Sequence, residues 1–497
     1  MHFPAVPPAT GRAKSKLKSQ SKMLALLLSL PAATAVSSVK PVWADSSQWH
    51  VPEYCSTPEQ MKMRGIERLP EGHFKLLQVQ AVVRHGARVP YMKMYCWHGE
   101  APYNCNLNTI VAAQTSNHAD IVAPRLYRKL YDWNTTADPY GNEYPGTCLV
   151  GQLVTQGIDQ HHANGRHLRA AYLGPLFGGA EALAGGLPAM EADYLLRSDD
   201  VQRTMLSGQA LFDGFFPPAE VSPAGAQTVN WHTRDLSRST LYPNKALCPR
   251  LGVVGSAGEH TAAFNALNNS AAQVALTSAW LRIAGPRFEW RRAFDCIMEA
   301  RCNGRPLPHG ITEKMFNESV AFYESWNKIN YNYNNAAFSK LAMRPLIREI
   351  RDQMLRTPVR RKFVLHSGHD TTVLPLLSAL GGSVFDGHWP HYAHMVVFEL
   401  YAGVGQDQLH PTHFRILSNG KPVRMEGCAT DVCSIETFET FVDVDLSDAK
   451  LGGCSLTVLE KAQQVASTQT VSLPLALGGA VLCSALRSGV ARANRTL

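Results

Sequence analysis

The chain has 497 residues, of which 45% are hydrophobic, so it is long enough to bury one large core or two. Its formal net charge of +8 is concentrated at the two ends: six Lys or Arg precede residue 45, three Arg follow residue 486, and neither segment contains an acid. Residues 45–486 therefore carry a net charge of −1. This balance excludes a protein that binds nucleic acid through a large basic surface.

Residues 1–44 have the pattern of a secretory targeting segment. A basic region precedes the apolar run Met23–Leu30, and small residues follow, with cleavage sites predicted near Ala35 and Ala44. An uncleaved signal anchor is the alternative, although the apolar run is short of a full membrane span. Sequons that agree with secretory passage and predict a glycoprotein occur at Asn134, Asn268, Asn317 and Asn494.

The first predicted strand, Phe74–Val83, runs directly into the sequence RHGAR at 84–88. Two permanently charged guanidinium groups, Arg84 and Arg88, thus flank the imidazole of His85. The planar fork of arginine fits a phosphate group, and a histidine between two such forks could act as nucleophile, acid or ligand. The strand and the second arginine favour this interpretation over a basic surface turn.

Residues 91–145 are rich in Tyr, Asn, Trp and Cys and show no sustained period. We expect loops over the mouth of an active site. Trp97 and His98 could reach a substrate, but packing within the loops is the favoured expectation. Helical spacing returns over Gly151–Leu173, and the Gly- and Ala-rich residues 174–186 predict a turn or linker.

A second strand is predicted at Tyr194–Leu196 and a helix at Val201–Phe212. The polar residues between them are expected to cap this helix: Ser198, Asp199 and Asp200. Arg203 falls in the first helical turn, where backbone N–H groups and the helix dipole also attract anions. Arg197, at the strand end, is the weaker candidate for binding an anion.

Residues 219–340 are mainly helical in pattern and are predicted to form a cap domain inserted between the strands of the sheet. This segment also holds a group of aromatic residues, for which a place in the core is favoured over a cofactor site: Phe316, Phe322, Tyr323, Trp326, Tyr331 and Tyr333.

A third strand, Phe363–Leu365, leads into the loop sequence GHD at 368–370 and a helix predicted over Val373–Leu380. His369 and Asp370 supply a second imidazole and a carboxylic acid that can donate a proton. Two alternatives remain: Asp370 only caps the helix, or the loop and His366 form a metal site. The metal alternative is disfavoured because the first motif already supplies fixed cations.

Closing strands are predicted at His394–Leu400 and His413–Leu417. Repeated strand–loop–helix units predict an α/β fold with a mostly parallel central sheet flanked by helices, and ligands collect at the carboxyl ends of such strands. The apolar stretch Val471–Leu486 allows a weak membrane anchor, a lipid-anchor signal or a disordered end.

Ten of the eleven cysteines lie in the body of the chain, between Cys55 and Cys454, which indicates an oxidising compartment and disulfide bonds. The pairs Cys428/Cys433 and Cys296/Cys302 are close enough for local bridges, although spacing alone does not determine connectivity. No CxxC pair occurs, so a zinc site is not expected, and Cys483 in the tail is expected to be free.

The chain resembles the histidine acid phosphatase family, the two-motif branch of the histidine phosphatase superfamily. The resemblance rests on four stretches in family order within residues 72 to 445: RHGARVP at 84–90, GQLVTQGIDQHHANGRHLRAAY at 151–172, RSDDVQRT at 197–204 and GHDTT at 368–372. The stretch QHHANG at 160–165 is similar to the subgroup that includes the 2-phosphoxylose phosphatase. Ala87 stands where many members carry Asp, which weakens any assignment to the prostatic or lysosomal enzymes.

The resemblance implies specific roles. His85 is the nucleophile that forms a phosphohistidine, and Asp370 protonates the leaving group. The phosphate oxygens are held by Arg84, Arg88, Arg203 and His369. It also implies a phosphatase domain at 45–456, with an α/β core at about 70–218 and 341–445, a helical cap at about 219–340, and a C-terminal tail at 457–497.

This chemistry is consistent with the residue types. Three arginines and a second histidine can meet the charge on a transferring phosphoryl group without a metal or other cofactor. Nearby cations should keep the imidazole of His85 unprotonated at acidic pH, and a bound phosphate dianion should help Asp370 to retain its proton. We therefore expect an acidic pH optimum.

The predicted function is an acid phosphatase, a hydrolase of phosphate monoesters, that is secreted, lysosomal, vacuolar or lumenal in the Golgi, with membrane anchoring left open. Its substrate is a small molecule or a glycan. More specialised alternatives are a glycan 2-phosphoxylose phosphatase, a phytase, which the neutral body disfavours, and a lysophosphatidic acid phosphatase. A non-catalytic phosphate-binding protein and a phosphomutase are disfavoured alternatives of other classes.

Overall fold

The computed structural model describes residues 43–461, apart from gaps at 45, 70–71, 73, 92–95, 98–99, 104, 106–108, 113–125, 130–145, 182–189, 219–228, 357–359, 404–409 and 459. Most of the predicted targeting segment and the whole apolar stretch 471–486 therefore lie outside the described residues, as do His98, Asn134, Cys483 and Asn494. Asn268 and Asn317 are described, and both are exposed.

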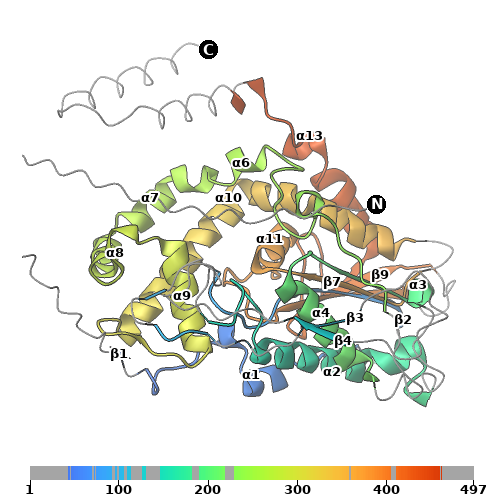
Figure 1. Cartoon of the computed structure of the whole chain (residues 1–497). Coiled ribbons are helices and arrows are strands. Elements are labelled where there is room, and N and C mark those ends of the chain that lie inside the picture. Colours follow the sequence, from blue (N-terminus) through green and yellow to red (C-terminus); the bar gives the residue numbers. More distant parts are fainter. Residues whose placement is uncertain are drawn as a thin grey trace, which may run out of the picture. The chain divides into compact units, whose positions relative to one another are not determined.

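A seven-stranded sheet forms the centre of the fold (Figure 1). Its strand order is β10-β9-β8-β2-β7-β5, and β11 pairs with β9 beside β10. The strands are β2 (Phe74–Arg84), β5 (Tyr194–Ser198), β7 (Phe363–Gly368), β8 (Met395–Gly403), β9 (His413–Ser418), β10 (Lys421–Val423) and β11 (Val432–Ser434). All five strands predicted from the sequence are present, with ends that differ by a few residues.

The α/β fold is confirmed, but the sheet is mixed rather than mostly parallel. Parallel pairing is confined to β2, β7 and β5, whereas β8, β9, β10 and β11 pair antiparallel. The physical reason lies in the connections. Helical segments separate the parallel strands, while the short link between β8 and β9 lets the chain turn back on itself.

Helices cover both faces of the sheet (Figure 1). On one face, α2 (Thr155–Phe177) and α4 (Gln202–Phe215) pack on alternate residues of β2, Val79, Ala81 and Val83. On the other face, the second half of α10 (Glu313–Met354) and α11 (Asp370–Leu380) pack against Val82 and against apolar residues of β8 and β9. Both faces of β2 are buried, so its apolar run is nearly continuous.

A second, mainly helical region supplies one wall of the site described below. It contains α6 (Leu251–Val254), α7 (Ala262–Asn268), α8 (Ala271–Ala284), α9 (Trp290–Cys302) and the first half of α10. The backbone of α10 leaves helical geometry at Tyr333–Ala336, close to the predicted end of the cap at residue 340. The division into a core and an inserted cap stays a prediction.

The remaining elements are short. Two-stranded ribbons pair β1 (Trp43–Ala44) with β6 (Leu307–Pro308) and β3 (Thr109–Ala112) with β4 (Leu126–Lys129). Further α-helices are α1 (Pro58–Lys62), α3 (Met190–Asp193), α12 (Ile435–Thr440) and α13 (Asp448–Leu451). Among the described residues, no helix combines the length and apolar character that crossing a bilayer requires.

Five disulfides link the ten cysteines of the body: Cys55–Cys302, Cys96–Cys296, Cys105–Cys148, Cys248–Cys454 and Cys428–Cys433. The local Cys428–Cys433 bridge is confirmed. The prediction of a Cys296–Cys302 bridge is wrong, because both residues lie in α9 and pair with Cys96 and Cys55, respectively. This number of disulfides fits a chain that folds in the oxidising secretory pathway.

Candidate active site

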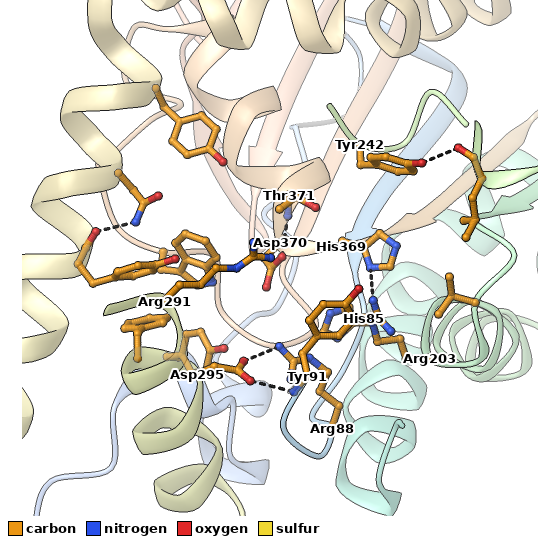
Figure 2. Close-up of a pocket in the computed structure, with 18 residues that line it drawn as sticks. His85, Arg88, Tyr91, Arg203, Tyr242, Arg291, Asp295, His369, Asp370 and Thr371 are labelled. Atoms are coloured by element: carbon orange, nitrogen blue, oxygen red, sulfur yellow. Dashed lines mark hydrogen bonds and ion pairs between the residues drawn. The ribbon is translucent and has the colours of Figure 1, made fainter. Parts of the chain in front are cut away.

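Three separate motifs meet at one edge of the sheet. The parallel strands β2, β7 and β5 are in register there, with Arg84 opposite Gly368 and Ser198 opposite Ser367. Parallel strands place their carboxyl ends at the same edge, so the segments that follow each strand are brought together. A cavity of about 510 Å³ at this edge is lined by five of the six predicted residues, His85, Arg88, Arg203, His369 and Asp370 (Figure 2). Arg84, the sixth, lies directly behind and contacts Asp370.

His85 follows β2, and its side chain is almost wholly buried. Its Nδ1 lies 2.9 Å from the carbonyl oxygen of Gly86, which can only accept, so Nδ1 carries the hydrogen. The other nitrogen, Nε2, is then an unprotonated base. Burial and the neighbouring charges of Arg84, Arg203 and Arg88 lower the pKa of His85 well below its usual value. The imidazole therefore keeps a free electron pair at acidic pH.

The loop after β2 is held against two helices. The N–H of Gly86 donates to the hydroxyl of Ser207 in α4 at 3.1 Å, and the N–H of Ala87 donates to the side-chain oxygen of Gln160 in α2 at 2.8 Å. A methyl group at Gly86 would overlap the backbone of Gly157. Only glycine allows this close approach, which explains its place after His85.

Arg84 and Asp370 form an ion pair in which Arg84 is buried and Asp370 is partly exposed to the cavity. An N–H of Arg84 lies 3.1 Å from Oδ2 of Asp370, and the guanidinium also donates to the hydroxyl of Tyr54 at 2.7 Å. The N–H of Thr371 donates to Oδ1 of Asp370 at 2.8 Å. Burial opposes ionisation of Asp370, but the charges of Arg84, Arg88 and His369 outweigh it and lower its pKa.

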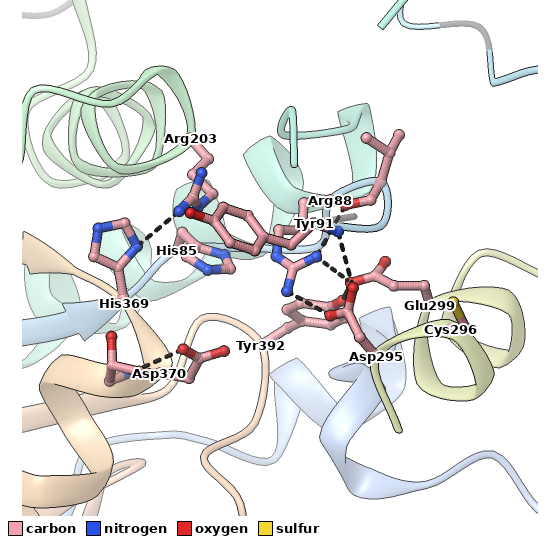
Figure 3. Close-up of polar contacts among 12 residues, drawn as sticks. His85, Arg88, Tyr91, Arg203, Asp295, Cys296, Glu299, His369, Asp370 and Tyr392 are labelled. Carbon is pink, nitrogen blue, oxygen red and sulfur yellow. Dashed lines mark hydrogen bonds and ion pairs between the residues drawn. The ribbon is translucent and has the colours of Figure 1, made fainter. Parts of the chain in front are cut away.

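Arg88 is held by two carboxylates of α9 (Figure 3). Its guanidinium contacts Asp295 at 2.7 Å and Glu299 at 2.9 Å. Asp295 also accepts the N–H of Tyr91 at 2.8 Å, which ties the loop after β2 to this helix. Burial raises the pKa of Glu299 to about 8, against the opposing charge of Arg88, so Glu299 is neutral at acidic pH. These carboxylates were not among the predicted site residues.

Arg203 and His369 lie side by side opposite Arg88 (Figures 2 and 3). An NH2 group of Arg203 lies 3.3 Å from Nδ1 of His369, and no ion pair to a carboxylate is formed by Arg203 within the described residues. The Nε2 of His369 lies 3.0 Å from Oδ2 of Asp199. The predicted capping role of Asp199 is wrong: α4 begins after Val201 without a side-chain cap, and Asp199 points to His369 instead.

Aromatic residues form much of the lining of the cavity. The rings that line it are Tyr54, Tyr91, Tyr242, Phe294, Tyr323, Tyr331 and Trp389. Two of them, Tyr323 and Tyr331, were expected to be core residues. Tyr323 is buried and Tyr331 is partly buried, and both also line the cavity. Beyond the phosphate-facing cluster, Arg291 is the one cationic residue among the described lining residues.

Three other residues weighed from the sequence lie elsewhere. Arg197 forms an ion pair with Glu349 of α10 and lines a separate cavity of about 230 Å³. His366 lines that same second cavity, so it does not converge with His369 and Asp370 on one ligand. Trp97 is buried and stacks on Trp280, in agreement with the packing expectation.

Comparison with known proteins identifies the family. The family model described as "Histidine phosphatase superfamily (branch 2)" matches residues 75–419, so the chain belongs to this superfamily. Counting factor 60 of Dictyostelium discoideum is 27% identical over 401 residues, which cover 78% of this chain and 89% of that protein. Human 2-phosphoxylose phosphatase 1 is 25% identical over 426 residues, which cover 80% of this chain and 83% of that protein.

Among solved structures, the apo form of Hafnia alvei phytase is 15% identical with a TM-score of 0.49, and covers 78% of this chain and 100% of that one. Membership of the superfamily confirms the predicted class: the protein is a phosphatase, a hydrolase of phosphate monoesters. The chemical roles of individual residues are a separate matter, which the geometry of the cavity addresses.

Proposed function

We propose that this protein is an acid phosphatase that works through a phosphohistidine on His85. The observation that carries the proposal is the environment of this imidazole. Its Nδ1–H is held by the carbonyl of Gly86, which leaves Nε2 free, and Arg84, Arg88 and Arg203 surround it. A nitrogen base with no proton, placed among three fixed cations, is equipped to attack phosphorus.

In the first step, Nε2 of His85 attacks the phosphorus atom in line with the ester oxygen. The N–P bond forms, the P–O bond breaks, and Asp370 gives its proton to the departing oxygen. Arg84, Arg88, Arg203 and His369 bind the equatorial oxygens, where charge is spread in the transition state. In the second step, Asp370 takes a proton from water, the resulting hydroxide attacks phosphorus, and His85 and inorganic phosphate are released.

Acidic pH suits this mechanism. The low pKa of His85 keeps the nucleophile unprotonated in acid. Asp370 has a lowered pKa in the ligand-free protein, because it faces Arg84, Arg88 and His369. A phosphate dianion bound by these same cations cancels their effect and raises the pKa of Asp370, so the acid keeps its proton in the substrate complex at mildly acidic pH.

The walls of the cavity support a substrate with one phosphate and a leaving group of low charge. Aromatic rings surround the space beyond the phosphate cluster and suit the faces of a sugar ring. An inositol polyphosphate would place several dianions there, where Arg291 is the single cationic residue among the described lining residues. A phosphorylated sugar on a glycan is therefore our leading substrate, ahead of inositol polyphosphates and lysophosphatidic acid. The setting would be the lumen of the secretory pathway, a lysosome or vacuole, or the cell exterior.

Steady-state hydrolysis of p-nitrophenyl phosphate from pH 4 to 7 tests the reaction. Wild type should turn over fastest in acid, and His85→Ala should lose at least about 10⁴-fold in kcat. Activity of the His85→Ala variant within tenfold of wild type would overturn the proposal. Binding of phosphate without turnover by wild type would instead indicate a non-catalytic phosphate-binding protein.

A substrate panel tests the leaving-group preference. Xylose 2-phosphate in an oligosaccharide, inositol hexakisphosphate and a lysophosphatidic acid are compared by kcat/KM at the optimum pH. We expect the highest value for the sugar phosphate. A higher value for inositol hexakisphosphate would contradict the proposal that the aromatic rings of the cavity bind a sugar, but not the phosphohistidine mechanism.

A further inference from the structure

Asp199 is a buried acid at the edge of the active site to which the mechanism above gives no role. It follows β5, and its side chain has no exposed surface. One oxygen, Oδ2, lies 3.0 Å from Nε2 of His369, and the other, Oδ1, accepts a hydrogen bond from the hydroxyl of Ser239. Arg197 of the same motif is paired with Glu349, and its charge also interacts with Asp199. A buried carboxylate in contact with a histidine is stabilised when that histidine carries a proton.

The two nitrogens of His369 face different groups. Nε2 lies 3.0 Å from Oδ2 of Asp199, an oxygen that has no other partner among the described residues and can only accept when ionised, so this contact favours a hydrogen on Nε2. Nδ1 faces the cavity and the guanidinium of Arg203 at 3.3 Å, so it carries none in the ligand-free protein. An ionised phosphate oxygen accepts hydrogen bonds and cannot bind the free electron pair of Nδ1. His369 can therefore bind the phosphate dianion only after Nδ1 gains a proton.

We propose that Asp199 is a positioning residue that allows His369 to enter the phosphate complex as an imidazolium, with Nε2–H directed to Asp199 and Nδ1–H donated to a phosphate oxygen. The inference rests on the phosphate-binding role proposed for His369. The added proton comes from solvent when the phosphate dianion binds, and it returns to solvent when phosphate leaves.

The charges around His369 are consistent with its gaining a proton when phosphate binds and losing it when phosphate leaves. Arg203 in α4 and His85 after β2 oppose a proton on the ring, whereas Asp199 after β5 and Asp370 in α11 favour it. Tyr242 lines the same cavity as a neutral phenol. Burial and Arg203 lower the pKa of His369 in the ligand-free protein, against the opposing effect of Asp199. A bound dianion adds the negative charge that tips the balance toward the imidazolium.

Asp199→Asn tests this role, with Asp200→Asn as the matched control, because Asp200 is the next residue and is exposed. An amide can still accept from Nε2–H but does not stabilise the imidazolium. We expect Asp199→Asn to raise the Ki of inorganic phosphate about tenfold or more at pH 6 and to move the alkaline limb of kcat/KM about one pH unit toward acid. Asp200→Asn should change neither. Unchanged Ki and pH profile in a folded Asp199→Asn variant would overturn the inference.

A second measurement does not depend on replacing Asp199. The ¹⁵N signals of the wild-type imidazoles, with that of His369 identified by its loss in His369→Asn, report which ring nitrogens are protonated. We expect one N–H, at Nε2, in the free protein and two in the complex with inorganic phosphate. A neutral His369 in the phosphate complex would overturn the inference even if Asp199→Asn fails to fold. Loss of p-nitrophenyl phosphate hydrolysis in wild type would instead contradict the proposed function, so the two failures are distinct.

Discussion

Arg203 is the arginine of the site that forms no ion pair with a carboxylate within the described residues, and Arg203→Ala removes its charge. Arg84 faces Asp370, and Arg88 faces Asp295 besides the neutral Glu299, so the charge of each arginine is already balanced by one carboxylate before substrate binds. Among the described residues, His369 and the ring face of Tyr91, 5.0 Å away, contact the guanidinium of Arg203. It should therefore contribute strongly to binding of the phosphate dianion.

The size of the effect follows from the bonds lost. A guanidinium can donate two hydrogen bonds to phosphate, and each hydrogen bond to a charged group contributes about 1.5 to 3 kcal/mol. Allowing for water that enters the vacated space, we expect a loss of about 3 to 4 kcal/mol, which is roughly 100- to 1000-fold in kcat/KM. Arg203→Lys keeps the charge but not the fork, and should lose about tenfold.

Arg197→Ala is the matched control, because it removes an arginine from the same motif that points to Glu349 and the second cavity. Its kcat/KM for p-nitrophenyl phosphate should stay within about threefold of wild type, with a loss in stability of about 2 to 4 kcal/mol, because Arg197 is buried and its removal breaks contacts to Glu349 and Thr240. Equal losses of activity in the two variants, or an Arg203→Ala variant within threefold of wild type, would refute the assignment of Arg203 to the phosphate.

Further predictions concern the acid, stability in acid and the disulfides. Asp370→Asn should reduce kcat about 100-fold or more for an alkyl phosphate but much less for p-nitrophenyl phosphate, whose leaving group needs no proton; equal losses would contradict a general acid. Burial and Arg197 lower the pKa of His366 to about 3 in the folded protein. As the pH falls below 6.5, His366 therefore gains a proton in the unfolded chain but not in the folded protein. This residue thus destabilises the fold in acid. The free energy of unfolding of His366→Leu, measured in urea, should therefore rise relative to that of wild type by about 2 to 3 kcal/mol as the pH falls from 6.5 to 4.5. A difference between the two proteins that does not change with pH would contradict this. Removal of the Cys96–Cys296 bridge, which spans 200 residues, should lower the free energy of unfolding by about 3 to 5 kcal/mol, more than removal of Cys428–Cys433, and chemical denaturation compares the two.

The sequence alone was sufficient to predict the part of the site that comes from strand ends. RHGAR, RSDDVQR and GHD each combine a strand with charged residues at its carboxyl end, so their convergence follows from parallel pairing. The two acidic residues that contact Arg88, Asp295 and Glu299, could not be predicted in the same way. Asp295 and Glu299 lie on α9, about 200 residues from Arg88, and on an amphipathic helix they are indistinguishable from solvated charges.

Other differences have similar physical causes. The apolar runs of β8 and β9 predict buried strands but do not report strand direction, so the antiparallel half of the sheet was missed. The aromatic residues of α10 predict burial, which is right for Phe316, Phe322 and Tyr323 but wrong for Tyr333, which is exposed. Periodicity also does not tell which rings meet a cavity. Asp199 shows the same ambiguity, because an acid before a helix is typical of a cap and equally able to contact a histidine from another strand.

Trapping of the phosphoenzyme tests the central claim most directly. Wild type is mixed with a ³²P-labelled phosphate monoester at pH 5, quenched in alkali and digested, and the labelled peptide is sequenced by mass spectrometry. A phosphohistidine is stable in alkali and labile in acid, and we predict that this label lies on His85 and is absent from His85→Ala. An active enzyme that yields no acid-labile label, or a label on a residue other than His85, would contradict the account.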